Sequence, residues 1–271
     1  MKVRVGDIDI AYDRAGSGVP VLLVMGLATT RIGWVMQMSA LSEHYDVACF
    51  DNRGMGETTI PEATWTMDTM VADATGLADA LDWDRFHLVG ISMGGMIAQE
   101  MTLAHQDRVR SLTLISTQHG GPDHVFPGPR VLSLFGFDGD PMERIRLGVD
   151  VTFGQRFKEE HPDFIETMTQ FATTHPPSRR AVESQAIAVG MWSNQGGTSA
   201  RLGDIRVPTL VLHGTADELI PSANGELIAS KIPDAKLVTF PDAGHALITE
   251  RAAEVNEAIL DHLRSADERS A

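Results

Sequence analysis

The sequence predicts a doubly wound α/β protein with a mostly parallel sheet of eight strands. Short apolar runs, typical of strands that are covered on both faces, alternate with longer segments whose apolar residues recur every three or four positions. This alternation indicates a parallel sheet joined by right-handed crossovers through helices. With 271 residues the chain can bury a full core, and we expect one core domain with an insertion.

The first 118 residues supply six of the expected strands. Apolar and polar residues alternate on both sides of Gly6 and Asp7, which predicts a two-stranded hairpin at an edge of the sheet. Four interior strands are expected at 21–25, 46–50, 86–89 and 109–115. Helical periodicity predicts helices at 34–41 and at 67–81, where Thr66 is the expected N-cap. A third helix is expected directly after the strand at 86–89.

The alternation of strands and helices stops between residues 119 and 204. Pro and Gly clusters separate short helical patterns there, and seven of the ten phenylalanines fall in this third of the chain, so some of them must pack the segment itself. We expect an inserted helical cap (lid) at 119–204, on a core domain formed by 1–118 and 205–271. The last two strands are expected at 207–213 and 235–240, before a closing helix.

Composition and charge exclude several classes of partner. The net charge of −15 and the pI near 5.0 disfavour nucleic acid and anionic membranes, because both require a positive field. The single cysteine, Cys49, cannot form an intrachain disulfide, and its apolar neighbours predict a buried strand residue. The N-terminus lacks the apolar segment of a signal peptide, so we expect a soluble, cytoplasmic protein.

Residues 86–101 predict a strand, a sharp turn and a helix, with Ser92 at the turn. The segment 90–95 reads Gly-Ile-Ser-Met-Gly-Gly, and the glycines that flank Ser92 leave room where side chains would collide with the strand or the helix. Such a turn exposes the serine hydroxyl, and the helix that follows points unpaired N–H groups at it. A tight turn that merely contains a serine gives the same pattern, so the assignment depends on partner residues.

Asp217 and His245 are the expected partners of Ser92. A serine nucleophile needs a base to take its proton, and the base needs an acid that holds its tautomer. Both residues follow predicted parallel strands, as Ser92 does, and the carboxyl ends of such strands converge on one crevice. The order Ser, Asp, His also matches the order known for one class of hydrolytic triad.

Other acids and histidines compete for these roles. Asp242 is too near His245 in sequence to come from a separate strand end, and Glu218 would point away from Asp217 in a tight turn. His213 ends a buried strand and is expected to be packed and hydrogen-bonded. The other eight histidines are expected on helix surfaces or in loops, mostly solvated and without metal-ligand spacing.

Three motifs in register resemble those of the α/β-hydrolase superfamily across nearly the whole chain. They are the segment at 90–95, His-Gly-Thr-Ala-Asp at 213–217 and Asp-Ala-Gly-His at 242–245, and the turn at 51–56 resembles the family's Asp-x-Arg-Gly-x-Gly segment. Many relatives have His-Gly where this chain has Met-Gly at 25–26, which leaves the orientation of that loop open.

The resemblance implies a role for each matching residue. Ser92 would be the nucleophile, His245 the general base and then acid, and Asp217 the orienting acid. The backbone N–H groups of Leu27 and Met93 would form the oxyanion hole, where each donor is worth about 3 kcal/mol.

The serine at the turn favours acyl transfer, because relatives that open epoxides or displace halide use aspartate there. We expect hydrolysis of carboxylic esters or lactones of small, largely apolar molecules through an acyl-enzyme, with no metal or other cofactor. Residues 26–30 resemble the corresponding loop of enol-lactone hydrolases. The alternatives are carbon–carbon bond hydrolysis of dienoic diketo acids, peptide release, cofactor-free perhydrolysis, and a non-catalytic relative that binds a small ligand and signals to a partner protein.

Spacing alone does not define the substrate pocket. Phe135, Phe137, Met191 and Trp192 are candidates for an apolar ceiling over the site, and the alternative is that they form the core of the cap itself. The expected partner is a small ester or lactone, and the protein is expected to be a monomer or a homodimer.

Overall fold

The computed structural model describes residues 1–135 and 139–270. Its strands form one eight-stranded sheet in the order β1-β2-β4-β3-β5-β6-β7-β8. The β1–β2 and β2–β4 pairs are antiparallel and all other pairs are parallel, which confirms the predicted sheet and its edge hairpin. The strands are β1 (Lys2–Val5), β2 (Ile8–Gly16), β3 (Pro20–Val24), β4 (Asp46–Phe50), β5 (Phe86–Ile91), β6 (Val109–Ile115), β7 (Thr209–Gly214) and β8 (Lys236–Phe240).

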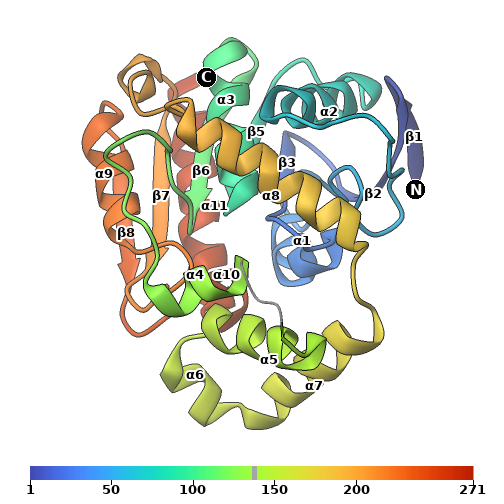
Figure 1. Cartoon of the computed structure of the whole chain (residues 1–271). Coiled ribbons are helices and arrows are strands. Elements are labelled where there is room, and N and C mark those ends of the chain that lie inside the picture. The colour runs from blue at the N-terminus through green and yellow to red at the C-terminus, as the bar shows by residue number, and fades with distance from the viewer. Residues whose placement is uncertain (136–138, 271) are drawn as a thin grey trace.

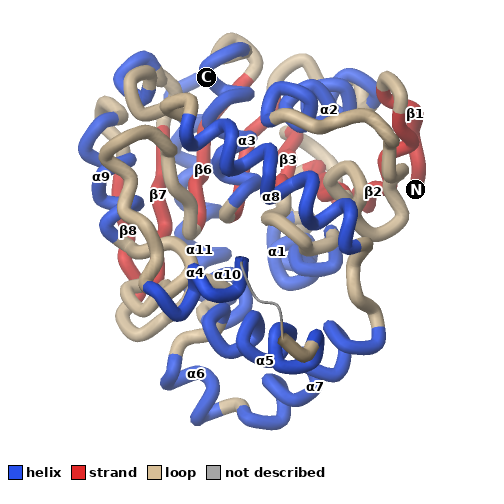
Figure 2. The backbone as a smooth tube through the Cα atoms, in the orientation of Figure 1, coloured by secondary structure: helices blue, strands red, loops and turns tan. Residues whose placement is uncertain are grey.

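Helices cover both faces of the sheet (Figures 1 and 2). Side chains at alternate positions of a strand point to opposite faces, so Leu22 and Val24 pack with the helices of one face and Val21 and Leu23 with those of the other. The first face carries α2 (Met67–Ala80), α3 (Met93–Ala104), η2 (Leu202–Asp204) and α9 (Ala223–Lys231), and the second carries η1 (Arg31–Trp34), α1 (Val35–Leu41), α10 (Leu247–Glu250) and α11 (Ala252–Ser270).

Local features follow the sequence pattern closely. The Thr66 hydroxyl accepts the Thr69 N–H and the Thr69 hydroxyl accepts the Thr66 N–H, so the predicted N-cap of α2 is part of a reciprocal capping box. Cys49 is buried in β4, as its apolar neighbours predict. No helix in the described part of the chain is long and apolar enough to cross a membrane.

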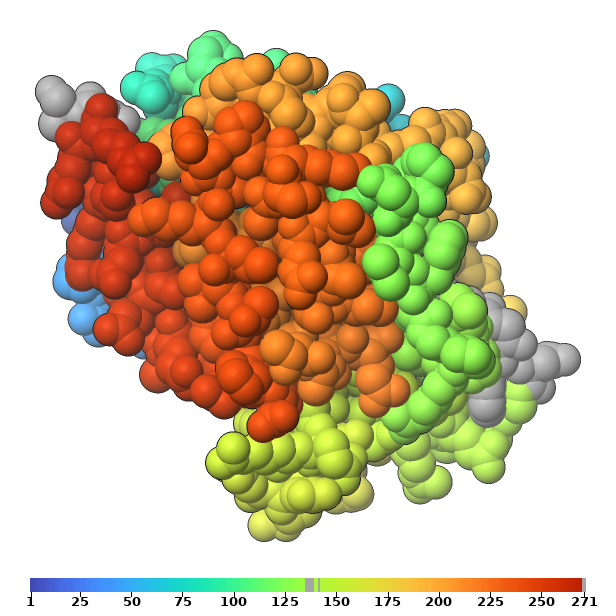
Figure 3. Space-filling model, turned by 90° about the vertical axis from the view of Figure 1, so that its left-hand side faces the viewer, coloured from blue at the N-terminus to red at the C-terminus, as the bar shows by residue number. Residues whose placement is uncertain are grey.

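Residues 119–204, which we call the insert, connect β6 to β7. Helices α5 to α7 lie at the bottom of Figure 1, whereas α8 crosses the centre of the view, and Figure 3 shows the yellow-green middle of the insert as a protrusion from the molecule. The rings of Phe153, Phe157 and Phe164 pack together at centroid distances of 5.5 to 5.9 Å, so these phenylalanines belong to the core of the insert. The insert contains α4 (Pro129–Phe135), α5 (Pro141–Thr152), α6 (Gln155–Glu160), α7 (Pro162–Thr174) and α8 (Arg179–Asn194).

The expectation that the remaining histidines are mostly solvated is wrong for three of the eight. His87 lies in β5, and His119 and His262 are also buried. The His87 ring is held by the Ser111 hydroxyl at 2.8 Å and by Asp267 at 3.2 Å. A polar residue within an apolar strand is buried with its partners, and those partners come from elements far away in the sequence.

Candidate active site

Ser92 lies at the bend between β5 and α3. Its φ of 55° is in the left-handed region, which a non-glycine residue adopts only where the surroundings impose it. The Ser92 N–H donates to the Ile115 carbonyl at 2.9 Å, and its own carbonyl accepts the Thr117 hydroxyl at 2.7 Å. Both contacts come from the neighbouring strand β6 and the residues after it, so the sheet fixes the bend.

The two glycines that flank the bend are required by close backbone contacts. A Cβ atom on Gly94 would lie 2.0 Å from the Val24 carbonyl oxygen, and one on Gly90 would lie 2.3 Å from the Gly94 carbonyl oxygen. Contacts this short are not possible for a real side chain. The Gly-x-Ser-x-Gly pattern therefore allows α3 to begin directly against β3 and β5, and it leaves the Ser92 side chain half-buried at the carboxyl edge of the sheet.

His245 and Asp217 meet at the same edge of the sheet, in the loops after β8 and β7. The His245 Nδ1 atom lies 2.8 Å from Asp217 Oδ2. Because a carboxylate only accepts hydrogen bonds, Nδ1 carries the proton and Nε2 is left as an acceptor. The Asp217 side chain has no exposed surface, whereas the His245 side chain is 12% exposed. The pair therefore presents one imidazole nitrogen to the site and keeps its carboxylate out of water.

Several donors surround the Asp217 carboxylate. The Ile220 N–H donates to Oδ1 at 2.8 Å, and His213 Nε2 lies 3.3 Å from Oδ2 while donating to the Ile220 carbonyl at 2.8 Å. Burial opposes ionisation of Asp217, but the charge of His245 and the hydrogen bonds from His213 and His245 outweigh it and lower the pKa of the carboxyl group. Asp217 is therefore held as an anion, and His213 is the packed, hydrogen-bonded residue expected from the sequence.

The competing acids lie elsewhere. The Glu218 side chain is 42% exposed and accepts two 2.9 Å hydrogen bonds from Arg130 on α4. Asp242 is exposed at the surface of the same loop as His245, and in the described residues its carboxylate makes no hydrogen bond to that ring. Of these three described acids, only Asp217 hydrogen-bonds to His245.

The expected hydrogen bond between Ser92 and His245 is not formed in the described part of the chain. In the part of the chain that the structure describes, the Ser92 hydroxyl and the His245 ring do not hydrogen-bond to each other. Hydrogen bonds between a nucleophile and its base are often long in ligand-free enzymes and shorten when substrate binds. The structure thus places both groups at one edge of the sheet and joins His245 directly to Asp217.

The loop after β3 lies against Ser92. A Cβ atom on Gly26 would lie 3.1 Å from the Ser92 Cβ and 3.6 Å from its Oγ, so the Met-Gly segment at 25–26 brings its backbone close to the serine side chain. The N–H groups of Leu27 and Met93 have no acceptor among the described residues. Two unpaired donors beside a serine hydroxyl are suited to stabilise an oxyanion.

Two residues that sequence reasoning missed hold this loop. The Asn52 side-chain amide donates to the Met25 carbonyl at 2.7 Å. Gln185, buried on α8 of the insert, accepts the Ala28 N–H at 3.0 Å and donates to the Arg53 carbonyl at 3.2 Å. A single glutamine inside a helical pattern gives no signal of a partner 157 residues away.

The proposed ceiling residues fall into different surroundings. Phe137 lies outside the described residues, as does the side chain of Phe135. Met191 on α8 is 46% exposed. Its neighbour Trp192 is only 7% exposed, packs in the core of the first face, and donates from Nε1 to Glu100 on α3 at 2.7 Å. This position favours the alternative for Trp192, namely packing rather than contact with a ligand.

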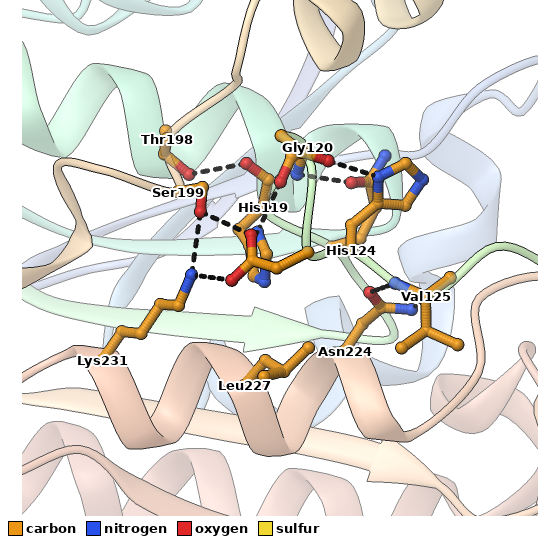
Figure 4. Close-up of polar contacts among 12 residues, drawn as sticks. His119, Gly120, His124, Val125, Thr198, Ser199, Asn224, Leu227 and Lys231 are labelled. Carbon is orange, nitrogen blue, oxygen red and sulfur yellow. Dashed lines mark hydrogen bonds and ion pairs between the residues drawn. The ribbon is translucent and has the colours of Figure 1, made fainter.

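A polar cluster fixes the two ends of the insert to α9 (Figure 4). Lys231 contacts the Ser199 hydroxyl at 2.8 Å and the Asp123 carboxylate, and Ser199 also donates to Asp123 at 2.7 Å. The Thr198 N–H donates to the His119 carbonyl at 2.8 Å. These contacts join residues 119–123 to residues 198–199, so the insert leaves and rejoins the core at one place. No group of three or more metal-ligating side chains occurs in the residues that the structure describes.

A doubly wound sheet with a serine at a strand–helix bend and an Asp–His pair at neighbouring strand ends is the architecture of the α/β hydrolases. The chain belongs to this family, because residues 19–252 match the family described as alpha/beta hydrolase fold. Hydrolysis is the general function that this membership supports.

Similar proteins cover nearly the whole chain. A putative carbamate hydrolase, RutD, of Azorhizobium caulinodans is 27% identical, with 94% of this chain and 95% of that protein covered. Among solved structures, a thermophilic esterase from Thermogutta terrifontis has a TM-score of 0.82 at 27% identity and 98% and 99% coverage of the two chains. Est816, described as an N-acyl homoserine lactone degrading enzyme, has a TM-score of 0.82 at 28% identity, with 96% and 99% covered.

Proposed function

We propose that the protein hydrolyses carboxylic esters or lactones of small, largely apolar molecules through an acyl-enzyme on Ser92. The observation that carries this proposal is the 2.8 Å hydrogen bond between His245 Nδ1 and the buried Asp217, at the sheet edge where Ser92 lies. That bond leaves His245 Nε2 as the base. The esterase and the lactone-degrading enzyme among the similar structures support the same class of substrate.

The proposed reaction has two halves. In the first, His245 Nε2 takes the Ser92 hydroxyl proton while Oγ attacks the carbonyl carbon, and the resulting oxyanion accepts hydrogen bonds from the Leu27 and Met93 N–H groups. Collapse of this intermediate breaks the bond to the alcohol oxygen, which receives the proton from His245. In the second half, water gives its proton to His245 and attacks the acyl-enzyme, and Ser92 leaves with that proton. Asp217 remains ionised and stabilises the imidazolium in both halves.

The preference for apolar acyl groups is proposed from the surroundings of Ser92. The two segments that flank its hydroxyl, residues 26–28 and 91–95, contain no charged residue. A charged acyl group in contact with them would lose hydration without gaining an ion pair, so short aliphatic acyl groups are expected to react faster than dicarboxylic ones.

A panel of aryl esters and lactones tests the proposal directly. We expect hydrolysis without added metal or nucleotide, at a rate that a chelator leaves unchanged, and we expect Ser92→Ala to abolish it. Loss of activity under chelation would contradict the metal-free relay. Failure to hydrolyse any member of the panel would favour the non-catalytic ligand-binding alternative.

A further inference from the structure

We propose that Glu250 is a positioning residue that fixes the His245 loop against the insert. The inference rests on the function proposed above, because it concerns how the proposed base is held. Glu250 is the last residue of α10, five positions after His245, and its carboxylate turns back onto the loop that carries this histidine.

The Glu250 carboxylate accepts hydrogen bonds from two backbone segments. Oε1 accepts the Gly154 N–H at 3.0 Å and the Gly244 N–H at 3.1 Å, and Oε2 accepts the Gly244 N–H at 3.0 Å. Gly244 directly precedes His245, whereas Gly154 lies between α5 and α6 of the insert. One carboxylate therefore joins the insert to the peptide next to the base.

A second bond holds the other side of the histidine. The Ala246 N–H donates to the Thr152 carbonyl at 3.0 Å. Both residues that flank His245 are thus bonded, through Glu250 or directly, to the segment 152–154. Backbone orientation on either side of a residue determines where its side chain points, so these bonds set the direction of the imidazole ring.

The two segments are in direct backbone contact. A Cβ atom on Gly244 would lie 2.4 Å from the Gly154 nitrogen, and one on Gly154 would lie 2.3 Å from the Asp242 carbonyl oxygen. No side chain fits at either position. The contact therefore requires glycine on both segments, and the carboxylate closes it by accepting both N–H groups.

The insert side of the contact is rigidly packed. Phe153 is buried and packs against Phe157 and Phe164, and the Lys158 N–H donates to the Gly154 carbonyl at 3.1 Å. The His245 loop thus rests on the packed junction of α5 and α6. Packing of this kind restricts the orientations that the loop can adopt.

The surroundings of Glu250 indicate that it acts as an acceptor rather than as half of an ion pair. No cation lies within ion-pair distance of it among the described residues, and its neighbour Arg251 pairs with Glu254 instead. Burial raises the pKa of Glu250, while the Gly244 and Gly154 N–H groups oppose that rise and the charge of Asp217 adds to it. The two N–H groups are therefore the main stabilising partners of the carboxylate.

Three variants of Glu250 test this role, with Glu257→Gln as a matched control on the exposed face of α11. Glu250→Ala leaves both N–H groups without an acceptor, and we expect kcat per folded molecule to fall roughly 10- to 100-fold while KM changes less than about twofold. Glu250→Gln keeps one oxygen for the two donors and should lose only about two- to fivefold. If Glu250→Ala does not fold, Glu250→Asp replaces it; its shorter side chain cannot reach both N–H groups, so we expect kcat to fall further than in Glu250→Gln, and a kcat equal to that of the wild type would overturn the inference.

Two readouts separate failure of this inference from failure of the proposed function. The first is the rate at which a fluorophosphonate modifies Ser92, measured by mass spectrometry and divided by the folded fraction. The second is the downfield proton signal of the His245 Nδ1–H, assigned by its absence in His245→Gln and independent of any substrate. A wild-type protein that shows this signal but neither hydrolyses esters nor reacts at Ser92 would contradict the proposed function alone.

The inference itself predicts that Glu250→Ala slows the modification of Ser92 and weakens or broadens the His245 signal, and that Glu257→Gln changes neither. Unchanged kcat and an unchanged signal in a destabilised Glu250→Ala protein would show that Glu250 only attaches the insert, and would overturn it. A loss in Glu250→Gln as large as that in Glu250→Ala would also overturn it, because acceptance of N–H groups would then not be the role.

Discussion

Trp192 offers the sharpest test of how the insert packs on the core. Its Nε1 donates to Glu100, which lies eight residues after Ser92 on α3 and hence about 12 Å along the helix from it. Removal of a buried tryptophan costs about 3–5 kcal/mol, a large part of the 5–15 kcal/mol that stabilises a typical domain. Trp192→Ala should therefore lower the free energy of unfolding strongly and leave the choice of substrate unchanged.

Trp192→Phe separates the ring from its N–H group. Glu100 keeps its hydrogen bonds from Arg201, at 2.6 and 3.0 Å, so the Phe variant should lose only about 1.5–3 kcal/mol. The assay is urea unfolding combined with kcat/KM for an acetate ester and a bulky apolar ester. We expect both esters to be affected equally per folded molecule in both variants. A selective loss of the bulky ester with unchanged stability would refute the core assignment and place Trp192 in the binding site.

Two further predictions concern the site, and a third concerns the acid sensitivity of the fold. Asp217→Asn should keep the fold, as judged by circular dichroism, and should lower kcat about 10⁴-fold because it favours the wrong His245 tautomer. Glu218→Gln should change kcat only slightly. The reverse ranking would assign the orienting role to Glu218 instead of Asp217. Gln185→Leu removes the acceptor of the Ala28 N–H, so kcat should fall roughly 10- to 100-fold with little change in KM. If the variant and the wild type had equal kcat values, the loop after β3 would keep its conformation without Gln185. Burial lowers the pKa of His262 from 6.5 to about 4, so the folded state binds this proton less readily than the unfolded state does. The contribution of neutral His262 to the free energy of unfolding is therefore fully present above pH 6.5 and is lost as the pH falls toward 4. At pH 4.5 the loss is about 2–3 kcal/mol. His262→Gln should reduce the stability difference between pH 7.5 and pH 4.5 in urea titrations, and an unchanged difference would contradict the assignment.

The core and the pair of candidate partners were predictable because the information lies in local pattern and chain order. Strands covered on both faces read as continuous apolar runs, and residues just after parallel strands meet at one edge, which brought Asp217 and His245 together. His87 lies in a strand that was predicted to be interior, but the partner that holds its ring was not predictable, because Asp267 lies 180 residues away. For the same reason no spacing pointed to Gln185, which accepts the N–H of a residue 157 positions away, or to the bond that joins Glu250 to Gly154, 96 positions away.

The insert shows a different limit of sequence reasoning. Met191 and Trp192 are adjacent on α8, yet one is half-exposed and the other is buried, since successive helical residues point about 100° apart. Both residues are large and apolar, so composition does not distinguish the one that packs in the core. Only the contacts of the helix with the core decide which face is covered.

The contacts of the insert with the core have a consequence for protein engineering. Gln185 reaches the loop after β3, Arg130 reaches the residue next to Asp217, and the segment 152–154 supports the loop of His245. If the insert were replaced by that of a relative only to reshape the substrate pocket, the supports of three loops would be replaced at once. To keep activity, such a chimera must carry matching residues on both sides of each support. We expect chimeras without these matching residues to fold well but to react slowly.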